Sequence, residues 1–145
     1  MTSLFEAKIR YDKMQEDGAV KKVTEAYLVD ALTFTEAEAR IIEEMKPYIS
    51  GEFSVVAIKR TKISEIFCND KAEGWWTVKV NFITLDEKTG AEKKAANLIL
   101  VQADDSDSAR DTFREGMKDT ISDYEIAGIN ETKYLEVFMY KASNE

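Results

Sequence analysis

The stretch that decides the fold is residues 18–50, GAVKKVTEAYLVDALTFTEAEARIIEEMKPYIS, because it returns 72 positions later as residues 90–122, GAEKKAANLILVQADDSDSARDTFREGMKDTIS. The two stretches share 13 identical residues in 33, and a shift of 71 aligns the segments on either side of them. We therefore predict an internal duplication. The chain is expected to be a single domain over residues 1–145, built from two tandem repeats at about 1–70 and 71–145.

Each repeat begins with the pattern of a β-hairpin. Residues 5–11 alternate apolar and polar side chains, and residues 20–29 form a second extended run after Gly18. Residues 76–82 repeat the alternation in the second copy, where Gly90 takes the place of Gly18 in a turn that is one residue longer. Period-two alternation on both sides of a glycine turn indicates a hairpin in each copy.

A helix start signal follows each hairpin. Thr35-Glu36-Ala37-Glu38 has the spacing of a capping box, and Asp105-Ser106-Asp107 offers caps and acids that favour a helix N-terminus. Apolar residues then recur at four-residue spacing, which predicts that one face of each helix is buried. These residues are Ala37, Ile41 and Met45 in the first copy, and Ala109, Phe113 and Met117 in the second.

A long third strand completes each repeat, at residues 53–67 and 124–138. The order strand, strand, helix, strand predicts an α+β fold: one antiparallel sheet of about six strands, with two helices packed on one face and a pseudo-twofold axis. The strand order stays open. The short connection at residues 68–74 favours pairing of the first copy's third strand with the second copy's first strand, which would interlock the halves.

Charge is distributed unevenly along the chain. The helical segments 32–54 and 103–125 carry −3 and −5, which together equal the net charge of −8. The strands instead place Lys8, Arg10, Arg60, Lys62 and Lys79 among their polar positions. With both helices on one face of the sheet, the other face is expected to be mixed to basic, although ordinary solvated surfaces would give the same pattern.

Few residue combinations point to catalysis. The chain has no histidine, and its only cysteine, Cys68, stands in no catalytic frame and is expected to be structural. The run Asp104-Asp105-Ser106-Asp107 lacks the glycine of a calcium loop and is interpreted as helix capping. We predict no cofactor and no metal site, and we expect a non-enzymatic protein rather than an enzyme.

The candidate binding residues lie on the strands. Thr61-Lys62 and Thr132-Lys133 occur at the same place in both copies, so they are candidates for a site that is present twice. Trp75 alternates with the core residue Trp76 and is expected on the opposite face, near Lys79 or Asn81. There it could stack a base, close the sheet edge or pack in an oligomer interface. Arg60 adds a further cation to this candidate surface.

One stretch suggests a relationship to a known family. Residues 25–40, EAYLVDALTFTEAEAR, together with Thr132-Lys133 and Glu136-Val137-Phe138, resemble a family of uncharacterised small proteins of Bacteroidetes and their phages. The resemblance spans most of the chain. It implies an origin, but it brings no activity and no catalytic residues.

These observations predict a cytoplasmic binding or accessory protein of phage or mobile-element type, whose partner is expected to be a protein. The start of the chain alternates apolar and charged residues, and no apolar run approaches the roughly 20 residues that span a bilayer. The alternatives are single-stranded nucleic-acid binding on the open sheet face, and a small-ligand protein or enzyme with a pocket between the repeats. A homo-oligomer is also compatible with the sequence.

Overall fold

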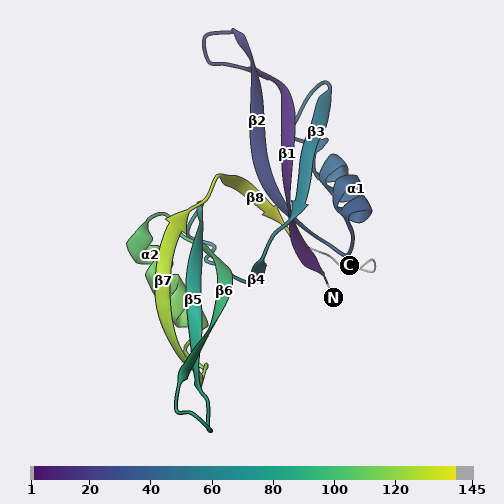
Figure 1. Ribbon diagram of the computed structural model, residues 1–145. Coiled ribbons are helices and arrows are strands. Elements are labelled where there is room, and N and C mark those ends of the chain that lie inside the picture. Colours follow the sequence, from purple (N-terminus) through teal and green to yellow (C-terminus); the bar gives the residue numbers. More distant parts are fainter. Residues whose placement is uncertain (1, 140–145) are drawn as a thin grey trace. The chain divides into compact units, whose positions relative to one another are not determined.

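The computed structural model describes residues 2–139 as eight strands and two helices (Figure 1). The elements in chain order are β1 (Ser3–Met14), β2 (Val20–Ala31), α1 (Phe34–Met45), β3 (Phe53–Arg60), β4 (Ile63–Phe67), β5 (Trp75–Leu85), β6 (Glu92–Gln102), α2 (Ser106–Gly116), β7 (Asp123–Glu131) and β8 (Tyr134–Phe138). The chain is therefore mixed α+β, as predicted.

The strands form two four-stranded sheets, so the predicted single sheet of about six strands is wrong. One sheet has the order β3-β1-β2-β8 and the other the order β4-β6-β5-β7. The chain divides accordingly into two compact units. Unit 1 consists of residues 2–61 with 133–139, and unit 2 consists of residues 62–132.

The predicted hairpins are present in both units. β1 pairs antiparallel with β2 around a turn at residues 15–19, and β5 pairs with β6 around a turn at residues 86–91, which is one residue longer. Gly18 (φ +85°) and Gly90 (φ +72°) adopt left-handed backbone angles in these turns, a conformation that glycine takes without a steric cost.

Both helices bury the predicted apolar residues, but α1 begins earlier than its sequence suggests. Its N-cap is Thr33, whose hydroxyl accepts a hydrogen bond from the Glu36 amide (3.1 Å), rather than Thr35. Thr33 and Thr35 both have a glutamate three residues later, so the spacing alone does not choose between them. α2 follows Asp105, which forms a reciprocal capping box with Ser108.

Each unit has its own core between its sheet and its helix. In unit 1, the residues of β1 and β2 that face α1 pack against it. In unit 2, the corresponding residues of β5 and β6 pack against α2. Figure 1 shows each helix lying against one face of its own sheet. The fully buried residues at the centre of these cores are Phe5, Ile9, Val29 and Ile41 in unit 1, and Val78, Val80, Val101 and Phe113 in unit 2.

The long third strand of each repeat is in fact two strands that lie in different units. β3 and β4 separate at Thr61-Lys62, and β7 and β8 separate at Thr132-Lys133. β4 then joins the sheet of unit 2 and β8 joins the sheet of unit 1. Residues 2–67 thus contribute their last strand, β4, to unit 2, and residues 75–138 contribute their last strand, β8, to unit 1.

The exchanged strands pair with the second strand of each hairpin. β4 lies parallel to β6, and β8 lies parallel to β2. The predicted pairing of the third strand with the first strand of the second copy is therefore wrong. The connection at residues 68–74 spans the width of β6, which lies between β4 and β5 in the sheet. Its length therefore does not require β4 and β5 to pair.

Candidate functional site

The two repeated Thr-Lys pairs mark the points where the chain passes from one unit to the other. The amide and the hydroxyl of Thr61 both donate to the Leu4 carbonyl, at 2.9 and 2.8 Å. Thr132 makes the same two hydrogen bonds to the Trp75 carbonyl, at 3.0 and 2.7 Å. Both threonines therefore fix the backbone at the points where the strands end.

Trp75 lies on the face of its sheet opposite α2, as expected, but it is not exposed. Only 6% of its surface is accessible, so the alternative in which Trp75 is an exposed stacking platform is wrong. Its register partner is Gln102, which accepts from the Asn69 amide and donates to the Ala72 carbonyl. These hydrogen bonds hold the connection before β5 against the end of the sheet that carries Trp75.

Arg60 does not lie on the open face of its sheet. Its register partner is the core residue Phe5, so the two side chains share the helix-covered face. The guanidinium lies 5.2 Å from the Phe5 ring centroid and 5.6 Å from that of Phe34. Its side chain thus covers the rim of the unit 1 core through cation–π contacts, and its expected place on the open face is corrected.

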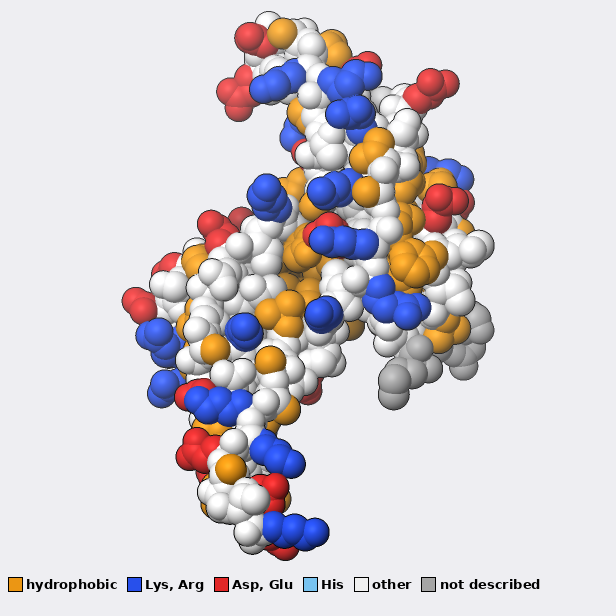
Figure 2. Space-filling view, in the orientation of Figure 1, with side chains coloured by type: hydrophobic (Ala, Val, Ile, Leu, Met, Phe, Trp, Pro, Cys, Tyr) orange, Lys and Arg blue, Asp and Glu red, His pale blue; other side chains and the backbone are white. Residues whose placement is uncertain are grey.

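The remaining predicted cations are exposed. Lys79 projects from the face of the unit 2 sheet opposite α2, between Leu98 and Gly128 of the neighbouring strands. Lys62 and Lys133 are exposed at the two strand breaks. Figure 2 shows Lys and Arg side chains scattered over the visible face, while most of the Asp and Glu side chains in this view lie toward its edges.

A groove runs along unit 1 between α1 and β3. One hollow of about 390 Å³ is lined by Phe34, Thr35, Glu38 and residues 55–58. A second hollow of about 580 Å³ is lined by Glu38, Ile42, Lys46 and residues 51–55. Because both hollows include Glu38 and Val55, they form one continuous surface, which we call the unit 1 groove.

The unit 1 groove combines apolar side chains with a free strand edge. Phe34 is 51% exposed and Val56 is 47% exposed. β3 is the edge strand of its sheet and pairs with β1, so within residues 2–139 the main-chain groups on its outer side have no strand partner. At Val56 the pairing of β3 with β1 shifts register, and this bulge places the side chain beside the groove.

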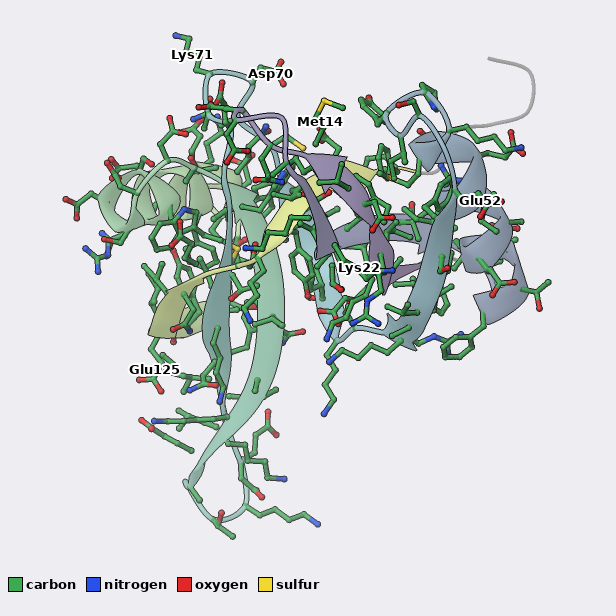
Figure 3. The ribbon with its side chains drawn as sticks, turned by 90° about the horizontal axis from the view of Figure 1, so that it is seen from above. Met14, Lys22, Glu52, Asp70, Lys71 and Glu125 are labelled. Carbon is green, nitrogen blue, oxygen red and sulfur yellow. The ribbon has the colours of Figure 1, made fainter. Side chains whose placement is uncertain are left out.

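Unit 2 has a groove at the same place with different chemistry. A hollow of about 620 Å³ between α2 and the edge strand β7 is lined by Arg110, Arg114, Tyr124, Glu125 and Ile126. We call it the unit 2 groove. In the sequence alignment, Arg110 and Arg114 take the positions of Glu38 and Ile42. Figure 3 labels Glu52 of the unit 1 groove and Glu125 of the unit 2 groove.

A family comparison adds context to this geometry. The family model for a domain of unknown function, DUF4494, matches residues 3–140. The chain belongs to the DUF4494 family. No match to a curated protein was found.

A carboxylate and two tyrosines form a partly enclosed polar group in unit 1 of this DUF4494 chain. Glu25 accepts hydrogen bonds from the Tyr11 hydroxyl (2.8 Å) and the Tyr27 hydroxyl (3.1 Å), and it forms an ion pair with Lys13 (3.3 Å). Its side chain is only 13% exposed. Unit 2 has no such group at the aligned positions. These positions hold Phe82, Asn97 and Ile99 in place of Tyr11, Glu25 and Tyr27.

The sequence interpretation missed this cluster, although the sequence contains its signal. Tyr11 and Glu25 lie on the two strands of a hairpin and point to the same face of the sheet. Pairing the two strands around Gly18 predicts this shared face. The cluster satisfies its own carboxylate with three donors, which is the arrangement that a partly buried acid needs. We interpret it as structural.

The Tyr11 hydroxyl provides a test of this cluster. Burial, followed by the hydrogen bond and the charge of Glu25, raises the pKa of Tyr11 from 10.0 to about 12. A raised pKa means that the stabilisation is complete below pH 10 and is lost as the pH rises toward 12. We expect urea unfolding to show a smaller loss of stability between pH 9 and pH 11.5 in Tyr11→Phe than in the wild-type chain.

The control for this titration is Tyr48→Phe, since Tyr48 is exposed. This variant is expected to follow the wild-type pH dependence. Equal alkaline losses in wild type and Tyr11→Phe would contradict the assigned role of Glu25.

Cys68 has no features of a nucleophile. Burial and the neighbouring Asp70 raise the pKa of its thiol, which disfavours the reactive thiolate. Within residues 2–139, no three Asp, Glu or Cys side chains are placed to share a metal ion. Neither helix in this part of the chain has the length and apolar composition needed to cross a bilayer.

Proposed function

We propose that this DUF4494 protein is a non-enzymatic binding protein that takes up an extended segment of a protein partner at the edge of β3. The observation that carries the proposal is the unit 1 groove, where exposed apolar side chains lie beside an unpaired strand edge. A peptide that adds to a sheet edge gains main-chain hydrogen bonds, while its alternate side chains enter the neighbouring hollows.

The groove favours a particular kind of segment. Phe34 and Val56 offer apolar contact area, whereas Glu38 and Glu52 supply negative charge along the same groove. Lys46 is paired with Glu43 at 2.8 Å, so its charge is partly compensated. The expected partner segment therefore alternates apolar and basic or neutral residues.

We also propose that the two units arose by duplication around a pseudo-twofold relationship and then diverged. Support comes from the aligned repeats and from the bulges at Val56 and Ala127, which lie at equivalent positions of β3 and β7. In this view the protein is a cytoplasmic accessory protein of a Bacteroidetes phage or mobile element, with one groove in each copy.

The proposal is tested by selecting peptides from a random display library on the immobilised full-length protein. Selected peptides should carry alternating apolar residues and should shift the NMR signals of β3 amides. Val56→Asp should weaken their binding by about tenfold or more, because it places a charge in the apolar groove.

Ala127→Asp is the matched control, since it puts the same charge at the equivalent bulge of unit 2. It should leave the affinity within about twofold. Peptides that shift no β3 amides, or that bind Val56→Asp as tightly as wild type, would refute the proposal. Binding of a single-stranded oligonucleotide to the open sheet face, unaffected by Val56→Asp, would favour nucleic-acid recognition instead.

A further inference from the structure

The unit 2 groove carries two arginines at its rim. Arg110 and Arg114 are four residues apart on α2, so they project from the same side of the helix. Both line the hollow that faces β7, together with Tyr124 and Ile126. Two guanidinium groups therefore border a surface that is otherwise partly apolar.

Neither arginine is fully engaged by neighbouring acids. Arg110 lies 3.9 Å from Asp107, whose side chain is almost fully exposed, and a contact of this kind contributes little. Among the ion pairs formed by residues 2–139, none involves Arg114. The fork of donors that an arginine offers to a carboxylate is thus open on both residues.

Glu125 also lines the groove, but its carboxylate is already bound. Lys94 lies 2.7 Å from Glu125 Oε1, and Asn81 donates to the same oxygen at 3.3 Å. The register partner of Glu125 is Asn81 on the face opposite α2, so these contacts direct the acid away from the helix. Its charge is compensated there and does not cancel the charge of the two arginines.

We infer that the unit 2 groove binds an extended acidic segment of a partner protein, with Arg110 and Arg114 taking its carboxylates while β7 pairs with its main chain. β7 is the edge strand of its sheet, and no strand of the described part of the chain pairs with its outer side, which allows this pairing. Tyr124 and Ile126 provide apolar contact for the residues that alternate with the acids.

The small number of basic side chains at the groove suits a few carboxylates better than a nucleic acid. The segment 103–125 carries −5 overall, and Asp107, Asp111 and Glu115 lie on the same helix as the two arginines. A nucleic acid needs several basic contacts along its phosphates. Two arginines are too few for a run of phosphates, but they can bind two carboxylates of a short acidic peptide.

The unit 1 groove should reject the same peptide, because the equivalent helix positions hold Glu38 and Ile42. The two grooves would then select different segments. This inference concerns a different surface and a different partner chemistry from the proposed function, so either one can fail without the other.

The inference is tested with a synthetic peptide of alternating valine and glutamate, blocked at both ends, titrated into the isotope-labelled full-length protein. We expect shifts of β7 and α2 amides that weaken with added salt, since the contacts are ionic. The double substitution Arg110→Gln/Arg114→Gln should reduce the affinity by about tenfold or more. A valine-lysine peptide should not shift these amides.

Lys118→Gln is the matched control, because it removes a positive charge just beyond the C-cap of the same helix, where Lys118 is paired with Glu115 at 2.7 Å. It should change the affinity by less than about twofold. Equal losses for Lys118→Gln and the double variant would show general electrostatic attraction and overturn the inference. It would also be overturned if an oligothymidine, but not the acidic peptide, shifted the β7 amides.

A gain of function separates this inference from the proposed function. Introducing both arginines into unit 1 with Glu38→Arg/Ile42→Arg should create a second site for the valine-glutamate peptide, seen as new shifts in β3. Val56→Asp, which tests the unit 1 groove, should leave peptide binding at β7 unchanged. Absence of new β3 shifts in a folded Glu38→Arg/Ile42→Arg variant would count against the role given to these two helix positions.

Discussion

Replacing Phe67 by alanine is expected to destabilise unit 2 by about 3 kcal/mol, although Phe67 belongs to the first repeat of the sequence. Phe67 lies on the exchanged strand β4 and packs against the unit 2 core, with its ring 6.3 Å from that of Phe113. Truncation leaves a cavity under α2 and removes buried apolar surface. Urea unfolding of the full-length variant measures the loss.

The location of the effect tests the strand exchange. NMR signals of α2 and β6 should change most in Phe67→Ala, while those of α1 and β1 should change little. Phe138→Ala provides the reciprocal variant, because Phe138 of β8 is buried in the unit 1 core and stacks on Tyr27 at 6.0 Å. Changes centred on α1 in Phe67→Ala would contradict the topology.

Substituting Gly116 by alanine is expected to destabilise the protein by about 1–3 kcal/mol, because the new methyl group would overpack the core. A Cβ at Gly116 would lie 2.5 Å from Cδ2 of the Phe67 ring. Alanine otherwise favours a helix over glycine by about 1 kcal/mol, so the steric conflict decides the sign. The free energy of unfolding in urea is the measurement.

A double-mutant cycle identifies the partner in this conflict. In the Phe67→Ala background the ring is gone, so Gly116→Ala should become neutral or stabilising by up to about 1 kcal/mol. Gly128→Ala is the control, since a Cβ there would meet its nearest atom, Nδ2 of Asn130, at 3.7 Å. Additive effects of Phe67→Ala and Gly116→Ala would show that β4 does not pack on the end of α2.

Local structure was largely predictable because its causes are local. The alternation in residues 5–11, the glycine turns and the four-residue spacing of Ala37, Ile41 and Met45 each reflect neighbours within a few positions, and the structure has the hairpins and helix faces that they indicate. The N-cap of α1 was missed by two residues, since Thr33 and Thr35 satisfy the same local rule.

The candidate site was predicted less well because it depends on contacts between distant residues. Alternation placed Trp75 on the correct face, but only 6% of its surface is accessible, and the alternation of a single strand does not predict that burial. Arg60 lies beside Phe5 because of the register of β3 against β1, which the sequence pattern did not predict. Both grooves combine a helix and an edge strand, so neither was visible before the strand order was known.

The sequence by itself determined the elements of this protein and their order, because propensity, capping and periodicity act over short separations. Only the tertiary structure decided where the last strand of each repeat goes. The apolar residues of β4 and β8 fit the edge of either sheet, so pattern alone does not choose between them. Thr61 binds the Leu4 carbonyl where β3 leaves the unit 1 sheet, and Thr132 binds the Trp75 carbonyl where β7 leaves the unit 2 sheet. In each case the next strand joins the sheet of the other unit.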